Sequence, residues 1–200
     1  MRLLLLLLIF SCHTAPTVTE TAAANKDFYG KLSDAALSIV DESIEYDSQY
    51  TKIPYPNGDV PKSKGVCTDV VIRAYRKLGI DLQKQVHEDM AANFSKYPNI
   101  WGLKTTDTNI DHRRVPNLQV FFTTKGEVKP ISTKAEDYKP GDIVTWLLSG
   151  KLTHIGLVVD KKGIEGRYQV VHNIGYGQVC EDVLFNYTVT GHYRYKPKAP

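Results

Sequence analysis

Cysteine is scarce in this sequence. Only three cysteines occur among 200 residues, at positions 12, 67 and 180. Thiols this few and this scattered exclude a disulfide framework and a cysteine-rich zinc site. One pair, Cys67 with Cys180, remains as a disulfide that an exported protein would tolerate. An unpaired cysteine is either a small buried hydrophobic residue or a reactive thiol, and the composition leaves both interpretations open.

Strong charge and internal repetition are absent as well. The formal net charge is only +3 and there is no basic run, which argues against a nucleic-acid-binding protein. No fixed-period repeat and no long low-complexity segment occur, so the chain is not a repeat protein. A hydrophobic content of 42% with 24% charged residues is typical of one globular domain.

The N-terminus carries a short apolar run, residues 3–10, after a positively charged start. This run is too short to span a bilayer and is typical of a secretory signal, so we predict a signal peptide over residues 1–11. Residues 12–30 are rich in threonine and alanine without an apolar period, which predicts a flexible tether. The folded domain is then expected over residues 31–198.

The signal ends in Ile9-Phe10-Ser11-Cys12, which resembles the lipobox of bacterial lipoproteins. This resemblance implies that Cys12 is lipidated and attaches the protein to a membrane. The alternative is ordinary signal cleavage within the alanine-rich stretch that follows. Either way, we expect an exported protein of the periplasm or cell envelope.

Apolar periodicity divides the domain into helices followed by strands. Residues spaced by three or four positions predict helices over 31–46, 67–78, 82–94 and 116–126. Strand-like segments bounded by turn residues follow at 142–148, 153–160, 167–174, 181–185 and 192–195. This order predicts an α+β fold in which N-terminal helices pack on an antiparallel sheet.

Cys67 lies at the expected start of the second helix. Gly65 precedes it, and Val70, Ala74 and Leu78 place the apolar side of the helix beneath it. A helix N-terminus has unpaired N–H groups and partial positive charge, and both favour the thiolate. The position therefore predicts a nucleophilic cysteine with a lowered pKa, provided that a histidine is supplied from elsewhere.

Two histidines occupy matched places in the strands. His154 opens the second predicted strand and His172 ends the third, so a hairpin turning at 161–166 brings them near one another. They share a face in one pairing register and are separated by a one-residue slip. In the favourable register His154 is the expected base, and His172, with Asn173 in reserve, holds its imidazole in the useful tautomer.

Polar residues are concentrated just before Pro116. Asp111, His112, Arg113 and Arg114 form this cluster, and we predict that it binds substrate because a guanidinium binds carboxylates in bidentate fashion. The alternative is a charged loop whose arginines pair with neighbouring carboxylates. A second polar run, residues 87–89, is predicted to be a solvated helix face rather than a metal site.

These motifs together resemble a known group of enzymes. A cysteine at a helix start, then PGDIV at 140–144, HIGLVV at 154–159 and a polar residue on the next strand are similar to NlpC-type papain-like cysteine peptidases. The chain more closely resembles a family of exported bacterial proteins described as a domain of unknown function. The sequence motifs that carry this resemblance lie between residues 35 and 195 and include YPNGDVP, GVCTDVVIRAYR, NIDHRRVPNL, GDIVTW and VVHNIG.

The resemblance implies a papain-like NlpC-type fold with Cys67, His154 and His172 in the catalytic places. It implies a hydrolase that cuts an amide bond in the peptide of peptidoglycan and needs no cofactor or metal. Thr68-Asp69 follow the cysteine where the wider pattern has Ser-Gly. Asp69 is therefore expected either to bind substrate or to cap the helix.

Three alternatives remain at this point. The first is a module on the same fold that binds wall peptides without cleaving them, which would survive alkylation of the thiol. The second is a lipid acyltransferase or lipase, because related folds act on acyl esters. The third is a metal-dependent amidase, which a chelator would inactivate.

Overall fold

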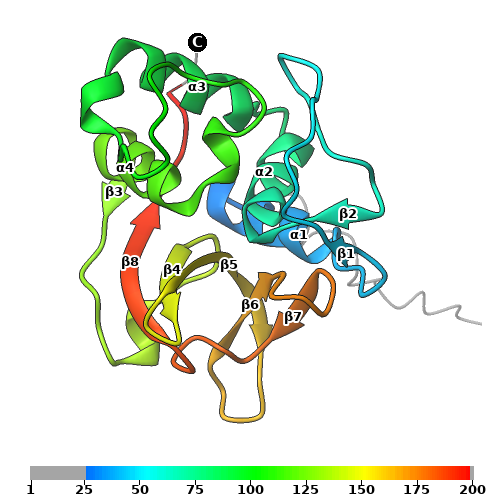
Figure 1. The fold of residues 1–200 in the computed structure, drawn as a ribbon. Coiled ribbons are helices and arrows are strands. Elements are labelled where there is room, and N and C mark those ends of the chain that lie inside the picture. The colour runs from blue at the N-terminus through cyan, green and yellow to red at the C-terminus, as the bar shows by residue number, and fades with distance from the viewer. Residues whose placement is uncertain (1–25, 199–200) are drawn as a thin grey trace, which may run out of the picture.

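The computed structural model describes residues 26–198 (Figure 1). The predicted signal peptide, Cys12 and most of the predicted tether lie outside the described residues. None of the helices between residues 26 and 198 has the length and apolar composition needed to cross a membrane.

Four α-helices form the first layer: α1 (Phe28–Leu37), α2 (Cys67–Lys77), α3 (Leu82–Ala92) and α4 (Val115–Lys125). Three short 3-10 turns accompany them: η1 (Phe94–Lys96), η2 (Asp111–Arg113) and η3 (Ala135–Asp137). The predicted helix starting at Cys67 is confirmed. So is the fourth helix, which has proline in its first turn and ends at Gly126.

The first helix differs from its prediction at both ends. It begins at Phe28, because Asp27 accepts a hydrogen bond from the backbone N–H of Gly30 and caps the first turn, so residues 28–30 belong to the helix rather than to the tether. It ends at Leu37 instead of residue 46. Farther on, Asp41 exchanges backbone hydrogen bonds with Gln178, and β1 (Glu45–Tyr46) pairs in parallel with β2 (Lys64–Gly65). These distant partners outweigh the local apolar period.

A six-stranded antiparallel sheet forms the second layer, in the order β3-β8-β4-β5-β6-β7. The strands are β3 (Glu127–Val128), β4 (Ile143–Leu148), β5 (Leu152–Lys162), β6 (Tyr168–His172), β7 (Val179–Glu181) and β8 (Thr188–Arg194). The α+β class and the antiparallel sheet are as predicted. β7 begins and ends earlier than the predicted strand at 181–185, and β8 begins earlier than the predicted strand at 192–195.

The two faces of β5 pack into different hydrophobic clusters. Ile155, Leu157 and Val159 belong to the main core, which includes residues of α1 and α2. Val158 belongs to a second cluster with Trp146, Val170 and other residues, and His154 lies beside Trp146 with ring centroids 5.7 Å apart. The alternation of a strand thus keeps His154 on the side of the sheet away from the main core.

The register between β5 and β6 decides where the histidines meet. Leu157 pairs with Val171, so His172 falls opposite Gly156 and diagonally across from His154 on the same face. A side chain at Gly156 would place its Cβ 2.6 Å from Val170 Cγ1 and 3.1 Å from His172 Cβ. The glycine is therefore required for close approach of the two strands, and it leaves room for the His172 ring.

Candidate active site

Cys67 is the first residue of α2 and its side chain is buried against the sheet (4% exposed). The thiol lies at the backbone N–H of Ile155, which acts with the N–H groups at the start of α2 to favour the thiolate. Because Ile155 directly follows His154, the thiol lies next to the peptide bond that joins these two residues. The packing of α2 on β5 thus places the thiol beside the backbone of the residue that follows the predicted base, His154.

The protonation state of Cys67 is opposite to the sequence prediction. Burial raises the pKa of its thiol to about 12, and the nearby carboxylate of Asp69 acts in the same direction. The N–H groups at the helix start lower the pKa of the thiol, but by less than burial raises it. The predicted lowered pKa is wrong for the resting protein, in which Cys67 is a neutral thiol.

The two histidines contact each other directly. His154 Nε2 lies 2.9 Å from His172 Nδ1, and both side chains are buried. Burial lowers the pKa of His154 to about 3, helped by the neighbouring His172. Burial also lowers the pKa of His172, against an opposing effect of Glu181, whose Oε2 is 3.1 Å from His172 Nε2. Both rings are therefore neutral at physiological pH.

Cys67 lies against the backbone next to His154, and its thiol is not hydrogen-bonded to a histidine ring of the described chain. Among residues 26–198, no hydrogen bond joins the Cys67 thiol to either ring, and Nδ1 of His154 has no partner. Asn173, the expected reserve, points elsewhere: its Nδ2 lies 3.5 Å from the Gly65 carbonyl and its Oδ1 accepts the N–H of Gly175. His172 is the polar residue that contacts the predicted base.

Asp69 fixes the first turn of α2. Its Oδ2 accepts the backbone N–H of Val66 at 2.7 Å, which caps the helix at the residue before Cys67. The same carboxylate pairs in bidentate fashion with Arg113, at 3.0 and 2.9 Å. Both side chains are almost fully buried, 4% and 2% exposed. Of the two roles expected for Asp69, the geometry provides the capping role.

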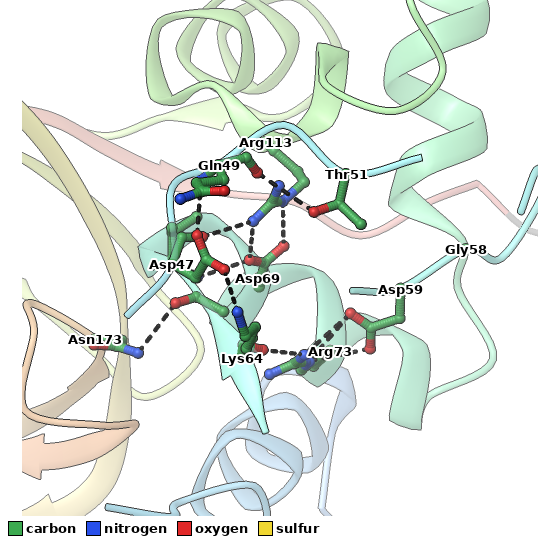
Figure 2. Close-up of polar contacts among 12 residues, drawn as sticks. Asp47, Gln49, Thr51, Gly58, Asp59, Lys64, Asp69, Arg73, Arg113 and Asn173 are labelled. Carbon is green, nitrogen blue, oxygen red and sulfur yellow. Dashed lines mark hydrogen bonds and ion pairs between the residues drawn. The ribbon is translucent and has the colours of Figure 1, made fainter. Parts of the chain in front are cut away.

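Figure 2 shows how this pair is tied to the loop before α2. Arg113 also reaches the carbonyl of Asp47 at 3.5 Å, and the Asp47 carboxylate pairs with Lys64 at 2.7 Å. Arg73, farther along α2, donates to the carbonyl of Lys64 and pairs with Asp59. The network holds the loop of residues 47–65 against the helix that carries the cysteine.

The polar cluster before Pro116 is divided by the fold. Asp111 is fully buried, where it accepts one hydrogen bond from the N–H of Asp107 and contacts His87 Nδ1 at 2.9 Å. His112 is buried too, and burial together with Arg113 lowers its pKa to about 3. Neither residue lines the hollow beside Cys67. Arg113 and Arg114 do line it.

The prediction of a solvated face over residues 87–89 is wrong for two of its three members. His87 contacts the buried Asp111 carboxylate, and Asp89 accepts a hydrogen bond from Tyr97 and pairs with Lys125. Only Glu88 is exposed. The helix flank is polar because it packs against polar groups of other elements, which the local sequence does not reveal.

The hollow beside Cys67 has a volume of about 200 Å³. Arg114 lies 4.0 Å above the Trp101 ring at its wall, and one buried guanidinium nitrogen, Nη1, has no hydrogen-bond partner among the described residues. Tyr46 also lines this hollow, and burial raises its pKa to about 12, with Cys67 and Asp69 contributing. Sequence reasoning missed Tyr46 and Trp101, because no local motif marks them.

A larger hollow, of about 410 Å³, lies elsewhere, near the C-terminal half of α2 and the loop after α1. Neither a cysteine nor a histidine lines it, so we place the chemistry in the smaller hollow that contains the thiol. Cys67 and Cys180 are both free, so the disulfide that the composition left open is not formed. Within residues 26–198 no three acidic, histidine or cysteine side chains are grouped so as to hold a metal ion.

A family model and a curated relative both match most of this chain. The model described as "Domain of unknown function (DUF1287)" matches residues 33–195. "Uncharacterized protein YijF" of Escherichia coli strain K12 is 48% identical over 200 residues, which cover 98% of this chain and 97% of the relative.

The solved structures that match this chain are much more distant in sequence. NlpC1 from Trichomonas vaginalis has a TM-score of 0.44 and 15% identity, over 91% of this chain and 47% of the other. The chain thus spans about half the length of that protein. An N-acetylmuramoyl-L-alanine amidase from Bacteroides uniformis has a TM-score of 0.49 and 13% identity, over 84% of this chain and 99% of the other.

The buried ion pair yields a prediction about stability. Arg113→Ala would leave the Asp69 carboxylate buried without its partner, so we expect a loss of about 3–5 kcal/mol in the free energy of unfolding. Urea denaturation measures it. The matched control is Arg114→Ala, which removes a half-buried guanidinium stacked on Trp101 and should cost about 1 kcal/mol or less. Equal losses in the two variants would contradict a structural role for the Asp69–Arg113 pair.

Proposed function

The chain belongs to the DUF1287 family, and we propose that it is an exported cysteine hydrolase that cleaves an amide bond in the peptide of peptidoglycan. The observation that carries this proposal is the position of Cys67 at the start of α2, beside the His154–Ile155 peptide, with His154 in contact with His172. The substrate class rests on the NlpC-like motifs in the sequence.

The proposed reaction has two halves. The Cys67 sulfur attacks the amide carbonyl while its proton passes to Nδ1 of His154, and N–H groups at the helix start stabilise the oxyanion. The amine then leaves with the proton from His154. Water, activated by the same ring, hydrolyses the thioester and restores the thiol.

Substrate must also bring the two reacting groups together. The thiol and His154 are not hydrogen-bonded in the resting protein, and catalytic hydrogen bonds are often long until substrate binds. His172 holds the His154 ring through Nε2, which leaves Nδ1 as the nitrogen that would accept the Cys67 proton once substrate brings the two groups together. His172 acts as the orienting residue in this account.

The hollow next to the thiol supplies a binding site for part of the substrate. Arg114 lines this hollow, and one of its guanidinium nitrogens has no hydrogen-bond partner among the described residues, so we expect the guanidinium to pair with a free carboxylate of a wall peptide. Trp101 offers an apolar surface next to it. We therefore assign substrate binding to Arg114, while Arg113 is engaged with Asp69, and Asp111 and His112 support the loop from behind.

One observation favours a second candidate, a module that binds wall peptides without cleaving them. The neutral, buried thiol of Cys67 and the absence of a hydrogen bond to His154 are what an unreactive cysteine would show. The two candidates differ in turnover. If the protein is a binding module, the wild type releases no product, and Cys67→Ala retains the affinity for wall peptides.

Digestion of purified sacculi tests the proposal directly. We expect mass spectrometry to detect newly released peptides with the wild type, and on the order of a 10³-fold or greater loss of rate in Cys67→Ala and in His154→Ala. Cys180→Ala, which removes the other thiol of the described domain, is the matched control and should leave the rate unchanged. Digestion by Cys67→Ala at the wild-type rate would refute a cysteine mechanism.

The pKa values predict an unusual pH dependence. His154 loses its base form only when the pH falls through about 3, and the Cys67 thiol ionises only when the pH rises through about 12. Neither group titrates between them, so kcat/KM should be nearly constant from about pH 5 to 9 in the range where the protein stays folded. A bell-shaped profile with limbs inside this range would instead indicate a preformed thiolate–imidazolium pair.

The lipid anchor is proposed on the sequence alone. An acylated Cys12 bearing two or more chains would bind a membrane firmly, whereas one chain binds only marginally. We expect Cys12→Ser to move the protein from the membrane fraction to the soluble fraction of the cell envelope. A mature N-terminus found near Ala24, well beyond Cys12, would show that ordinary signal cleavage occurs instead.

A further inference from the structure

Glu181 has no part in the sequence-based account, yet it is the last member of a chain of contacts that starts at the proposed base. It lies on β7, paired with Val170 of β6, so it is on the same face as His172 two residues along β6. Its Oε2 lies 3.1 Å from His172 Nε2, and His172 Nδ1 lies 2.9 Å from His154 Nε2. The three side chains form one line across three strands.

Few proton arrangements are compatible with the contacts that join Glu181, His172 and His154. An ionised carboxylate only accepts hydrogen bonds, so Glu181 requires a proton on His172 Nε2. A neutral His172 then has a lone pair on Nδ1, which requires a proton on His154 Nε2. A neutral His154 with its proton on Nε2 has its lone pair on Nδ1, the nitrogen without a partner.

We propose that Glu181 is a positioning residue that fixes the tautomers of both histidines and so leaves Nδ1 of His154 free to accept the Cys67 proton. The catalytic role of Glu181 in this proposal rests on the proposed function. The assignment of the two tautomers stands without it, because it follows from the contacts of Glu181 and His172 alone.

The opposite arrangement shows why a carboxylate at this place matters. If His172 carried its proton on Nδ1, it would donate to His154 Nε2 and leave a lone pair facing the Glu181 carboxylate, which is repulsive. His154 would then hold its own proton on Nδ1 and could not act as a base there. A doubly protonated His172 would have the same effect on His154, and the burial of His172, 1% exposed, disfavours that charge.

Glu181 is suited to substitution, since its side chain is 47% exposed, so changes there need not disturb the core. Glu181→Ala removes the acceptor. Glu181→Lys replaces it with a side chain that only donates, which favours a lone pair on His172 Nε2 and so reverses the tautomers along the line. The matched control is Glu165→Lys, the same change at an exposed carboxylate in the turn between β5 and β6.

Long-range proton–nitrogen NMR of the ¹⁵N-histidine-labelled protein reports which ring nitrogen is protonated. In the wild type and in Glu165→Lys we expect the proton on Nε2 of both His154 and His172. Glu181→Ala should give mixed tautomers, and Glu181→Lys should move the proton of both rings to Nδ1. Unchanged tautomers in both Glu181 variants would overturn the proposal.

Kinetics then test its catalytic meaning separately. With the wild type as reference, Glu181→Ala should lower kcat by about tenfold with little change in KM, as when the partner that orients a functional histidine is lost. Shifted tautomers with unchanged kcat would overturn the positioning role. If the tautomers shift but the wild type releases no product from sacculi, the proposed function fails while the tautomer assignment stands.

Discussion

The packing of the first turn of α2 against β5 is the contact on which the candidate site depends. It brings the Cys67 thiol to the backbone N–H of Ile155, one residue after His154. Asp69 holds this turn from inside, through the N–H of Val66 and the guanidinium of Arg113. A single buried carboxylate therefore connects the helix, the loop before it and the 3-10 turn at residues 111–113.

Burial has two opposite effects on the chemistry of this site. It fixes the position of the thiol and of the two imidazoles, and it also removes the solvent that would stabilise their charges. The resting protein consequently contains a neutral thiol and neutral rings, although the helix start favours the thiolate. In the proposed reaction, charge therefore forms only when the substrate carbonyl and the N–H groups of the helix start can accept it. If the proposed function holds, this arrangement keeps the thiol unreactive toward other electrophiles before a substrate binds.

The parts of the fold that follow from local pattern could be predicted from the sequence. The start of α2 at Cys67 and the alternation of β5 were predicted because apolar spacing and turn residues are adjacent in the chain. The shared face of His154 and His172 depended on the register, which Gly156 and the turn fix in three dimensions. The length of α1 was wrong because the pairing of Asp41 with Gln178 is invisible locally.

The residues of the candidate site were easier to predict than their protonation states and contacts. The sign of the Cys67 pKa shift depends on how completely the thiol is buried, which no spacing of residues reveals. Arg113 and Arg114 are neighbours in sequence, yet one pairs with Asp69 and the other stacks on Trp101 at the hollow. Glu181 and Tyr46 reach the site from segments that carry no motif, so only the folded chain places them there.

The central claim is that Cys67 attacks a carbonyl carbon with the help of His154. A small peptide aldehyde labelled with ¹³C at its carbonyl tests it, because a nucleophilic thiol converts the aldehyde to a stable thiohemiacetal that carbon NMR detects. The account predicts this tetrahedral signal with the wild type and with Cys180→Ala, and its loss with Cys67→Ala. A signal of equal strength with Cys67→Ala, or a signal that disappears only with Cys180→Ala, would contradict it.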